Sequence, residues 1–145
     1  MKKTLIVLAL LLGSSTALAN SYPNPISPQD AKTWVEVGKA VMIDVREKGE
    51  VSQGMAEPAY WYAKSSIDSN LEQFLTDLGQ YAGKEIILYC RSGHRASIVV
   101  EALAGRGIHA WNMGGYADWV AAGFATKLPT VEVGEYFEAE GVAAE

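Results

Sequence analysis

The feature that most constrains the fold is the junction around the single cysteine, where an apolar run meets a helical pattern. Residues 84–104 read KEIILYCRSGHRASIVVEALA. The apolar run Ile86–Tyr89 predicts a buried strand, and Ala96–Ala104 predicts a helix that ends at Gly105. A buried strand that leads directly into a helix is typical of parallel α/β sheets, in which the loops after the strands form the functional edge. We therefore expect Cys90 at that edge.

The rest of the chain alternates between short apolar runs and helical patterns in the same way. Ser27 is a good N-cap for a helix that begins at Pro28 and ends near Val37. Strands are predicted at 40–45, 59–63 and 108–113, helices at 71–78 (with Ser69 and Glu72 as a capping box) and after Gly115, and a loop at 48–58. This order predicts an α/β fold with a mostly parallel sheet and helices on both faces.

The first 19 residues have the pattern of a cleavable signal peptide. Lys2 and Lys3 are followed by the apolar run Leu5–Leu12 and by small residues that end at Ala19. The apolar run is too short to cross a bilayer as a helix, which needs about 20 residues. We expect export and cleavage after Ala19, with a retained membrane anchor as the alternative. In a bacterium with two membranes, cleavage places the mature protein in the periplasm.

Composition limits the partners of the mature chain. The whole chain has a formal net charge of −5, and the loss of Lys2 and Lys3 makes it more acidic. This charge argues against nucleic acid and anionic lipid as main partners. We expect one domain at residues 20–130 and an acidic tail at residues 131–145, whose role the sequence does not indicate.

The sequence CRSGHR, residues 90–95, has features that activate a thiol and attract an anion. A helix that starts just after the loop points its amide groups and the positive end of its dipole toward Cys90. Arg91 and Arg95 are permanent cations nearby, and together these effects favour the thiolate. Gly93 allows a tight turn in which successive amides converge on one anion. The loop predicts a nucleophile in an oxyanion cradle, although composition alone favours an inert buried thiol.

The length of the loop distinguishes two chemistries for a small anionic electrophile, namely sulfur transfer and phosphate or arsenate chemistry. Four residues lie between Cys90 and Arg95. Cysteine phosphatases resemble this loop but have one residue more there, which makes a wider ring for a tetrahedral phosphate. The corresponding position here is Ala96, which cannot bind an anion through its side chain. The sequence thus favours sulfur transfer over a phosphatase or an arsenate reductase.

Three segments carry a resemblance to a known family: MIDVRE at residues 42–47, YCRSGHRAS at 89–97 and NMGGYADWVAAG at 112–123. They resemble the single-domain rhodaneses, the thiosulfate sulfurtransferase family, and the resemblance extends from about Ile26 to Pro129. It implies a three-layer α/β sandwich and a persulfide on Cys90. It also implies that Arg95 and Arg91 bind the sulfonate end of the donor. The persulfide would be cradled by the backbone amides of Arg91, Ser92, Gly93, His94, Arg95 and Ala96.

Other charged residues near the loop have two interpretations each. Asp44 and Arg46, at the end of a predicted strand on the same edge, either brace the loop or form a purely structural ion pair, and the second is favoured because such pairs commonly support rather than react. For Arg95 the alternative is a surface ion pair, and for Arg91 it is solvent. His94 is expected at the mouth of the loop, because a thiolate needs no base. Two histidines and one cysteine are too few for a metal site, so we expect no metal and no organic cofactor.

One segment departs from the rhodanese pattern. Similar domains usually carry Gly-His-Ile-Pro-Gly-Ala before the second strand, whereas residues 54–59 here read GMAEPA. Met55 replaces the histidine and Pro58 replaces the inner glycine. In the cysteine loop, Ala96 stands where a serine is frequent, and Ser97 follows it. These differences concern the donor, the acceptor and the catalytic rate rather than the fold.

The predicted reaction is the transfer of sulfane sulfur from thiosulfate, or a similar small anionic donor, to a thiophilic acceptor. The sulfur passes through a Cys90 persulfide, and cyanide or a thiol then removes it. No membrane partner is expected after cleavage of the signal peptide. A non-catalytic persulfide carrier that hands sulfur to a protein acceptor is the main alternative, because the acidic tail and the changed segment at residues 54–59 keep it open.

Overall fold

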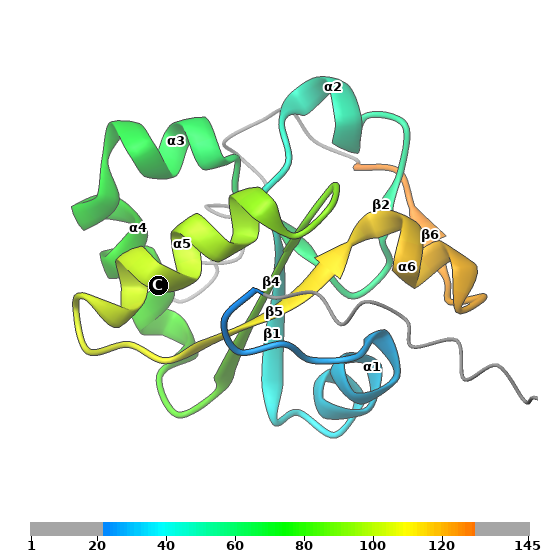
Figure 1. Cartoon of the computed structure of the whole chain (residues 1–145), viewed down its shortest axis with the longest axis horizontal. Coiled ribbons are helices and arrows are strands. Elements are labelled where there is room, and N and C mark those ends of the chain that lie inside the picture. Colours follow the sequence, from blue (N-terminus) through cyan, green and yellow to red (C-terminus); the bar gives the residue numbers. More distant parts are fainter. Residues whose placement is uncertain (1–21, 130–145) are drawn as a thin grey trace, which may run out of the picture.

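The fold is built on a four-stranded parallel sheet, and the computed structural model describes residues 22–129. The strands lie in the order β3 (Tyr60–Trp61), β1 (Ala40–Asp44), β4 (Glu85–Cys90) and β5 (Ala110–Gly115). At the carboxyl edge, Asp44 pairs with Tyr89, and Cys90 pairs with Gly115. The carboxyl ends of β1, β4 and β5 therefore meet at one edge of the sheet (Figure 1).

Helices cover both faces of this sheet (Figure 1). On one side lie α3 (Lys64–Ser69), α4 (Leu71–Leu78) and α5 (His94–Ala104), and on the other lie α1 (Pro28–Glu36) and α6 (Tyr116–Ala121). The short helix α2 (Lys48–Val51) follows β1, and a 3₁₀ turn (Gly79–Tyr81) follows α4. The predicted α/β class, with a parallel sheet between two layers of helices, is confirmed.

Two apolar clusters, one on each face of the sheet, follow from the alternation of side chains along the strands. In β1, Val41 and Ile43 pack toward α4 and α5, whereas Ala40 and Met42 pack toward α1 and α6. Burial of these side chains supplies the main driving force for folding. Cys90 belongs to the first cluster and is 1% exposed. The core of the domain therefore fixes the position of the cysteine.

The segment between β1 and β3 contains structure where a loop was predicted. It includes α2 and the two-residue strand β2 (Met55–Ala56). β2 pairs in antiparallel fashion with β6 (Thr126–Lys127), and the amide of Glu57 donates to the carbonyl of Ala125 at 3.0 Å. The segment is thus joined to the last described residues of the chain.

Two helix starts also differ from prediction. α5 begins at His94, two residues earlier than expected, so its first turn includes part of the cysteine loop. α4 is capped by Asn70, whose Oδ1 accepts from the amide of Gln73 at 3.1 Å, so the predicted Ser69 capping box is wrong. Ser69 instead ends α3, which was not predicted because Ile67 is the single large apolar residue of its sequence.

The predicted signal peptide at residues 1–19 and the predicted tail at residues 131–145 lie outside the described residues. Between residues 22 and 129, the structure contains no helix with both the length and the apolar character needed to cross a membrane.

Candidate active site

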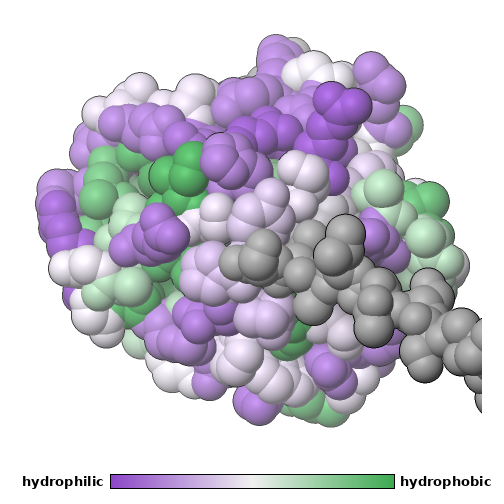
Figure 2. All heavy atoms as spheres, viewed as in Figure 1, coloured by the Kyte–Doolittle hydropathy of each residue, from purple (hydrophilic) through white to green (hydrophobic). Residues whose placement is uncertain are grey.

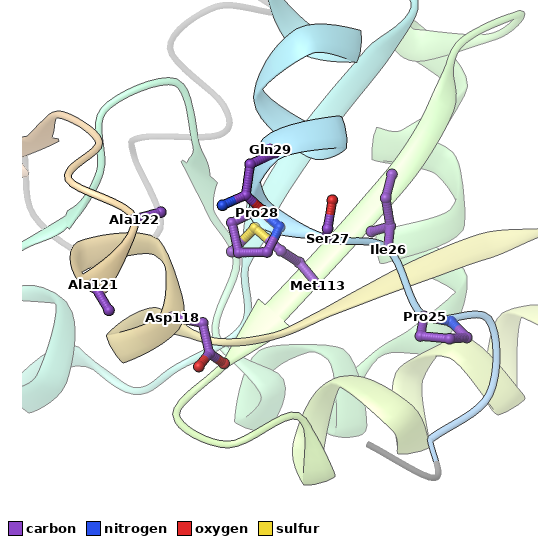
Figure 3. Close-up of a pocket in the computed structure, with 9 residues that line it drawn as sticks. All are labelled: Pro25, Ile26, Ser27, Pro28, Gln29, Met113, Asp118, Ala121 and Ala122. Atoms are coloured by element: carbon purple, nitrogen blue, oxygen red, sulfur yellow. The ribbon is translucent and has the colours of Figure 1, made fainter. Parts of the chain in front are cut away.

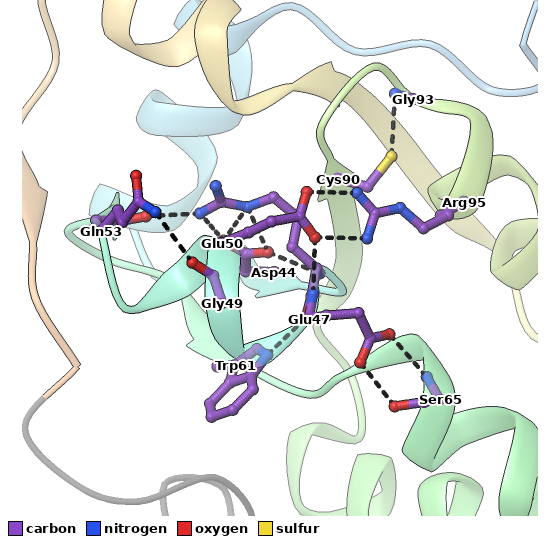
Figure 4. Close-up of polar contacts among 12 residues, drawn as sticks. Asp44, Glu47, Gly49, Glu50, Gln53, Trp61, Ser65, Cys90, Gly93 and Arg95 are labelled. Carbon is purple, nitrogen blue, oxygen red and sulfur yellow. Dashed lines mark hydrogen bonds and ion pairs between the residues drawn. The ribbon is translucent and has the colours of Figure 1, made fainter.

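Cys90 ends β4 and lies beside the first turn of α5 (Figure 4). Its Sγ accepts a hydrogen bond from the backbone amide of Gly93, with an N···S distance of 3.1 Å. Gly93 has a φ of +97°, in the left-handed region that favours glycine. A Cβ at this position would also lie 2.7 Å from the ring of Tyr22. The tight turn at Gly93 therefore brings the sulfur against the backbone of its own loop.

The sulfur lies at the amino end of a helix that has no side-chain cap. α5 extends over 11 residues from His94, and its N-cap Gly93 provides no side chain to accept a bond from the first turn. The first four amide groups of a helix have no acceptor within the helix, and they form the positive end of its dipole. Negative charge on Cys90 is therefore stabilised by this helix end as well as by the Gly93 amide.

Asn112 of β5 fixes the peptide that follows Gly93. Its Nδ2 donates to the Gly93 carbonyl at 2.9 Å, and its Oδ1 accepts from the amide of Gly114 at 2.8 Å. The amide of Ser97 donates to the same Gly93 carbonyl at 2.9 Å. The carbonyl and amide of a trans peptide point in opposite directions, so these bonds orient the amide of His94 away from β5. Asn112, which is 3% exposed, is thus a positioning residue for the cradle.

Gly115 lets the backbone of β5 lie directly against the loop. A Cβ built on Gly115 would lie 2.4 Å from the carbonyl oxygen of Arg91, which is far inside van der Waals contact. A larger residue here would displace the backbone next to Cys90. This close approach therefore requires glycine at position 115, the second glycine of the NMGG segment.

Arg95 forms a bidentate ion pair with Glu50 of α2 (Figure 4). Its Nη1 and Nη2 each lie 2.7 Å from one carboxylate oxygen. The hydrogen bonds from Arg95 lower the pKa of Glu50 to about 2, because they favour the ionised carboxylate. Glu50 also accepts from the amide of Glu47 at 3.0 Å, at the start of α2. Arg95, predicted as an anion ligand, thus already has its charge matched by a carboxylate.

Asp44 and Arg46 form a second ion pair, which is buried at the end of β1. Arg46 Nη2 lies 2.7 Å from Asp44 Oδ2, and Nε donates to both carboxylate oxygens at 3.0 Å. Burial raises the pKa of Asp44, and the adjacent guanidinium opposes that rise. Arg46 also donates to the Gly54 carbonyl at 2.7 Å and accepts from Trp61 Nε1, through its own carbonyl, at 2.8 Å. The Asp44–Arg46 pair therefore contacts the segment that contains Gly54 and Trp61. The ion pair with Glu50, in contrast, includes a residue of the cysteine loop itself, Arg95.

The other predicted ligands lie at different depths in the loop. Arg91, Ser92 and His94 are exposed, whereas Ala96 is buried. Hydrophilic side chains gather over α2 and the start of α5 on the face shown in Figure 2.

The second histidine of the chain, His109, lies away from the loop. His109 precedes β5 at the opposite edge of the sheet, where its ring packs on Trp111 with 4.9 Å between centroids.

The family comparison agrees with this geometry. Residues 27–122 match the family model described as a rhodanese-like domain. This protein belongs to the rhodanese-like family. The match covers most of the chain and confirms the resemblance carried by the three segments named above. Among the curated proteins, the comparison finds no match.

Solved structures of similar fold include other rhodanese-like proteins. A thiosulfate sulfurtransferase from Pseudomonas aeruginosa is 25% identical, with a TM-score of 0.62 and coverage of 76% of this chain and 20% of that chain. A rhodanese-like domain protein from Staphylococcus aureus is 25% identical, with a TM-score of 0.55 and coverage of 76% and 97%. A rhodanese-related protein from Thermoplasma volcanium, at 21% identity and a TM-score of 0.61, shares the fold. This chain therefore spans a fifth of the length of the Pseudomonas protein.

The segment that departs from the rhodanese pattern is part of the core. Met55, which stands in place of the usual histidine, is fully buried in the cluster under α1 and α6. The amide of Ala56 donates to the Tyr89 hydroxyl at 3.0 Å, and burial raises the pKa of that hydroxyl well above its ordinary value. At this position the rhodanese-like chain therefore has a packed apolar side chain and not a titratable one.

Two pockets lie near the carboxyl edge, and their chemistry differs. The first, of about 590 Å³, lies between the start of α1, β5 and α6 (Figure 3), and Asp118 is the single ionisable residue among those that line it. Asp118 already accepts from the amide of Gly115 at 3.0 Å. The second, of about 410 Å³, borders the cysteine loop and is lined by Arg46, Gly49, Glu50, Gln53, Arg91, Tyr116 and Ala117. The second pocket is the better candidate for a substrate, because its lining includes Arg91 of the cysteine loop and other charged groups.

Sequence reasoning missed Glu50 and Asn112 as residues that position the rhodanese-like loop. Glu50 lies three residues after the MIDVRE segment, and Asn112 begins the NMGG segment. Asn112 is a polar residue in an otherwise apolar strand, and a buried amide of this kind needs hydrogen-bond partners. That signal could have identified Asn112, whereas the partner of Glu50 is 45 residues away.

Proposed function

We propose that this protein is a sulfurtransferase that carries sulfane sulfur as a persulfide on Cys90. The observation that supports it most directly is the hydrogen bond from the Gly93 amide to Sγ, at the uncapped amino end of α5. Such an arrangement stabilises negative charge on the thiolate nucleophile and on the persulfide product. Membership of the rhodanese-like family, and the similarity to a thiosulfate sulfurtransferase, support the same chemistry.

The proposed first step is the attack of the Cys90 thiolate on the sulfane sulfur of thiosulfate. A sulfur–sulfur bond forms to Cys90, the bond to the sulfonate sulfur breaks, and its electron pair leaves with sulfite. In the second step, cyanide or an acceptor thiolate attacks the outer sulfur of the persulfide. Thiocyanate or an organic persulfide leaves, and Cys90 returns as a thiolate. The two steps balance without another oxidant or reductant, as a covalent double displacement.

A persulfide carrier without efficient turnover is the second candidate. It is favoured by the buried Met55, which gives the site no histidine where similar domains have one. A carrier would form the same persulfide but transfer it slowly to small acceptors. The rate of thiocyanate production therefore separates the two candidates.

The test is the intact mass of the purified protein after incubation with thiosulfate. We expect a gain of one sulfur that dithiothreitol reverses, steady thiocyanate production in the presence of cyanide, and neither result with Cys90→Ser. Since Cys90 is the only cysteine, the gain has one possible thiol site. Full activity in a folded Cys90→Ser variant would contradict the proposal. We also propose export, and the same spectrum of protein from the full chain reports whether residues 1–19 have been removed.

A further inference from the structure

A short arm at the start of the described chain, residues 22–26, lies along β5, which is an edge strand of the four-stranded sheet. The amide of Ile26 donates to the carbonyl of Asn112 at 3.0 Å, and the amide of Asn112 donates to the carbonyl of Asn24 at 2.8 Å. The side-chain Nδ2 of Asn24 donates to the Ala110 carbonyl at 3.1 Å. Asn24 has a φ of +50°, in the left-handed region that asparagine tolerates better than most residues. Main-chain and side-chain bonds therefore hold the arm to β5.

The arm and the cysteine loop are attached to the same residue of β5. The backbone of Asn112 binds the arm, and its side chain binds the Gly93 carbonyl at 2.9 Å. β5 thus holds the arm and the loop in a fixed relation. Tyr22, at the start of the arm, is the third residue after Ala19, so the cleavage predicted there leaves the arm on the mature chain.

The ring of Tyr22 covers the turn at Gly93. A Cβ built on Gly93 would lie 2.7 Å from both Cδ2 and Cε2 of Tyr22, and 3.2 Å from Cα of Gly114. The ring and the β5 backbone therefore fill the space beside Gly93 where a side chain would stand. Gly93 is buried, although its neighbours Ser92 and His94 are exposed. The arm thus covers one residue of an otherwise exposed part of the loop.

The covered residue is the one whose amide donates to Cys90 Sγ at 3.1 Å. Glycine has more backbone freedom than any other residue, so a glycine turn keeps one conformation only where contacts restrain it. A hydrogen bond shielded from water is also stronger than an exposed one. The Tyr22 ring supplies the restraint and the shielding at the point where the loop meets the sulfur.

We infer that the arm at residues 22–26 is part of the construction of the active site, and that Tyr22 is a positioning residue that holds the Gly93 amide against Cys90. This inference rests on the proposed function and adds a residue to it. Tyr22 lies 68 positions before Cys90 in the chain, and it acts through Gly93 and not on the substrate. The contact uses ring carbons, so a phenylalanine should serve equally well.

The first test is hydrogen exchange of the backbone amides, followed by NMR on the isotope-labelled protein. The Gly93 amide should be protected in the wild type, because it is buried and bonded to Sγ. Tyr22→Ala should raise its exchange rate by about tenfold and leave the Leu88 amide, in the core of β4, unchanged. Tyr22→Phe should restore the wild-type rate. Asn24→Gly, which keeps the positive φ and removes the Nδ2 donor, should have a smaller effect than Tyr22→Ala.

The second test is the rate of persulfide formation over a range of thiosulfate concentrations. Tyr22→Ala should lower the rate at saturating thiosulfate on the order of tenfold, with little change in the concentration that gives half of that rate. Tyr22→Phe should restore it. The matched control is Tyr81→Ala, because Tyr81 is also half-buried and its ring packs on Tyr60, with 5.5 Å between centroids. It should leave both the Gly93 exchange rate and the saturating rate unchanged.

The outcomes separate this inference from the proposed function, because hydrogen exchange requires no sulfur transfer. An unchanged Gly93 exchange rate in a folded Tyr22→Ala variant would overturn the inference. An equal rise at Leu88 would also overturn it, since the arm would then stabilise the whole domain and not the turn. Failure of Tyr22→Phe to restore the rates would rule out the ring contact as the cause. The expected exchange pattern without any persulfide in the wild type would keep Tyr22 as the residue that holds the turn and remove the proposed function.

Discussion

The two arginine–carboxylate pairs at the carboxyl edge have similar bidentate geometry and different surroundings. Asp44 and Arg46 are two residues apart in the chain, and their side chains are 0% and 6% exposed. Glu50 and Arg95 are 45 residues apart, and their side chains are 31% and 26% exposed. The first pair lies at the end of one strand, whereas the second joins α2 to the first turn of α5.

This difference separates a residue pair that the fold requires from one that positions the loop. A buried pair has lost its water, so removal of one partner leaves an isolated charge inside the protein. A half-exposed pair is partly hydrated and contributes little to the free energy of unfolding. Its value lies in geometry, because it fixes where the loop stands relative to α2. Three changes test this distinction.

The largest effect is expected for Asp44→Asn, which leaves Arg46 buried without a counter-charge. We expect the free energy of unfolding to fall by about 3–5 kcal/mol. Urea unfolding followed by tryptophan fluorescence measures this change. Asp68→Asn, which breaks the exposed pair with Lys64, is the control and should have little effect. A loss below about 1 kcal/mol in Asp44→Asn would place this pair in the same class as the exposed ones.

A smaller effect on stability and a larger one on chemistry are expected for Glu50→Gln. The free energy of unfolding should fall by less than about 1 kcal/mol, because the pair is partly hydrated. The rate of persulfide formation from thiosulfate should fall on the order of tenfold, because the loop is less well positioned. Rapid quench followed by intact mass measures this rate. If Glu50→Gln destabilised the protein as much as Asp44→Asn, the two pairs would not differ in role.

The smallest effect is expected on the stability of the protein as the pH is lowered. The pKa of Glu50 is lowered from 4.5 to about 2, so its contribution to stability is complete above pH 4.5 and is lost as the pH falls from 4.5 toward 2. The difference in unfolding free energy between wild type and Glu50→Gln should therefore be constant above about pH 5. Carboxyl NMR should give Glu50 a midpoint near 2. A midpoint at the ordinary value would mean that the ion pair is not formed in solution.

The sheet and the cysteine loop were accessible from sequence for a clear physical reason. The strand that became β4 was predicted at Ile86–Tyr89 because its apolar run is bounded by charged residues and followed by a helical pattern. The position of Cys90 at the strand end follows from the same pattern. These are local signals, and burial on both faces of a parallel sheet makes them strong.

The missed elements depend on contacts between distant segments. α2 has four residues and α3 has six, which is too short for a helix to be stable from its own sequence. The ion pair between Glu50 and Arg95 joins α2 to the first turn of α5 and holds α2 in position. β2 and β6 have two residues each and are about 70 positions apart, so no local pattern indicates their pairing. Contacts between segments so far apart in the sequence become visible only in the folded structure.

The close approach of Gly115 to the Arg91 carbonyl has a consequence for how such a site can change. On this side the loop rests on the backbone of β5, so main-chain contact as well as the apolar core fixes the position of the cysteine. Arg91, Ser92 and His94, meanwhile, are exposed. Substitutions at these three positions can alter which sulfur compounds are accepted while the nucleophile stays where it is. The position of the nucleophile and the specificity for the sulfur compound thus depend on different parts of the loop. Specificity can therefore change by substitution without loss of the fold.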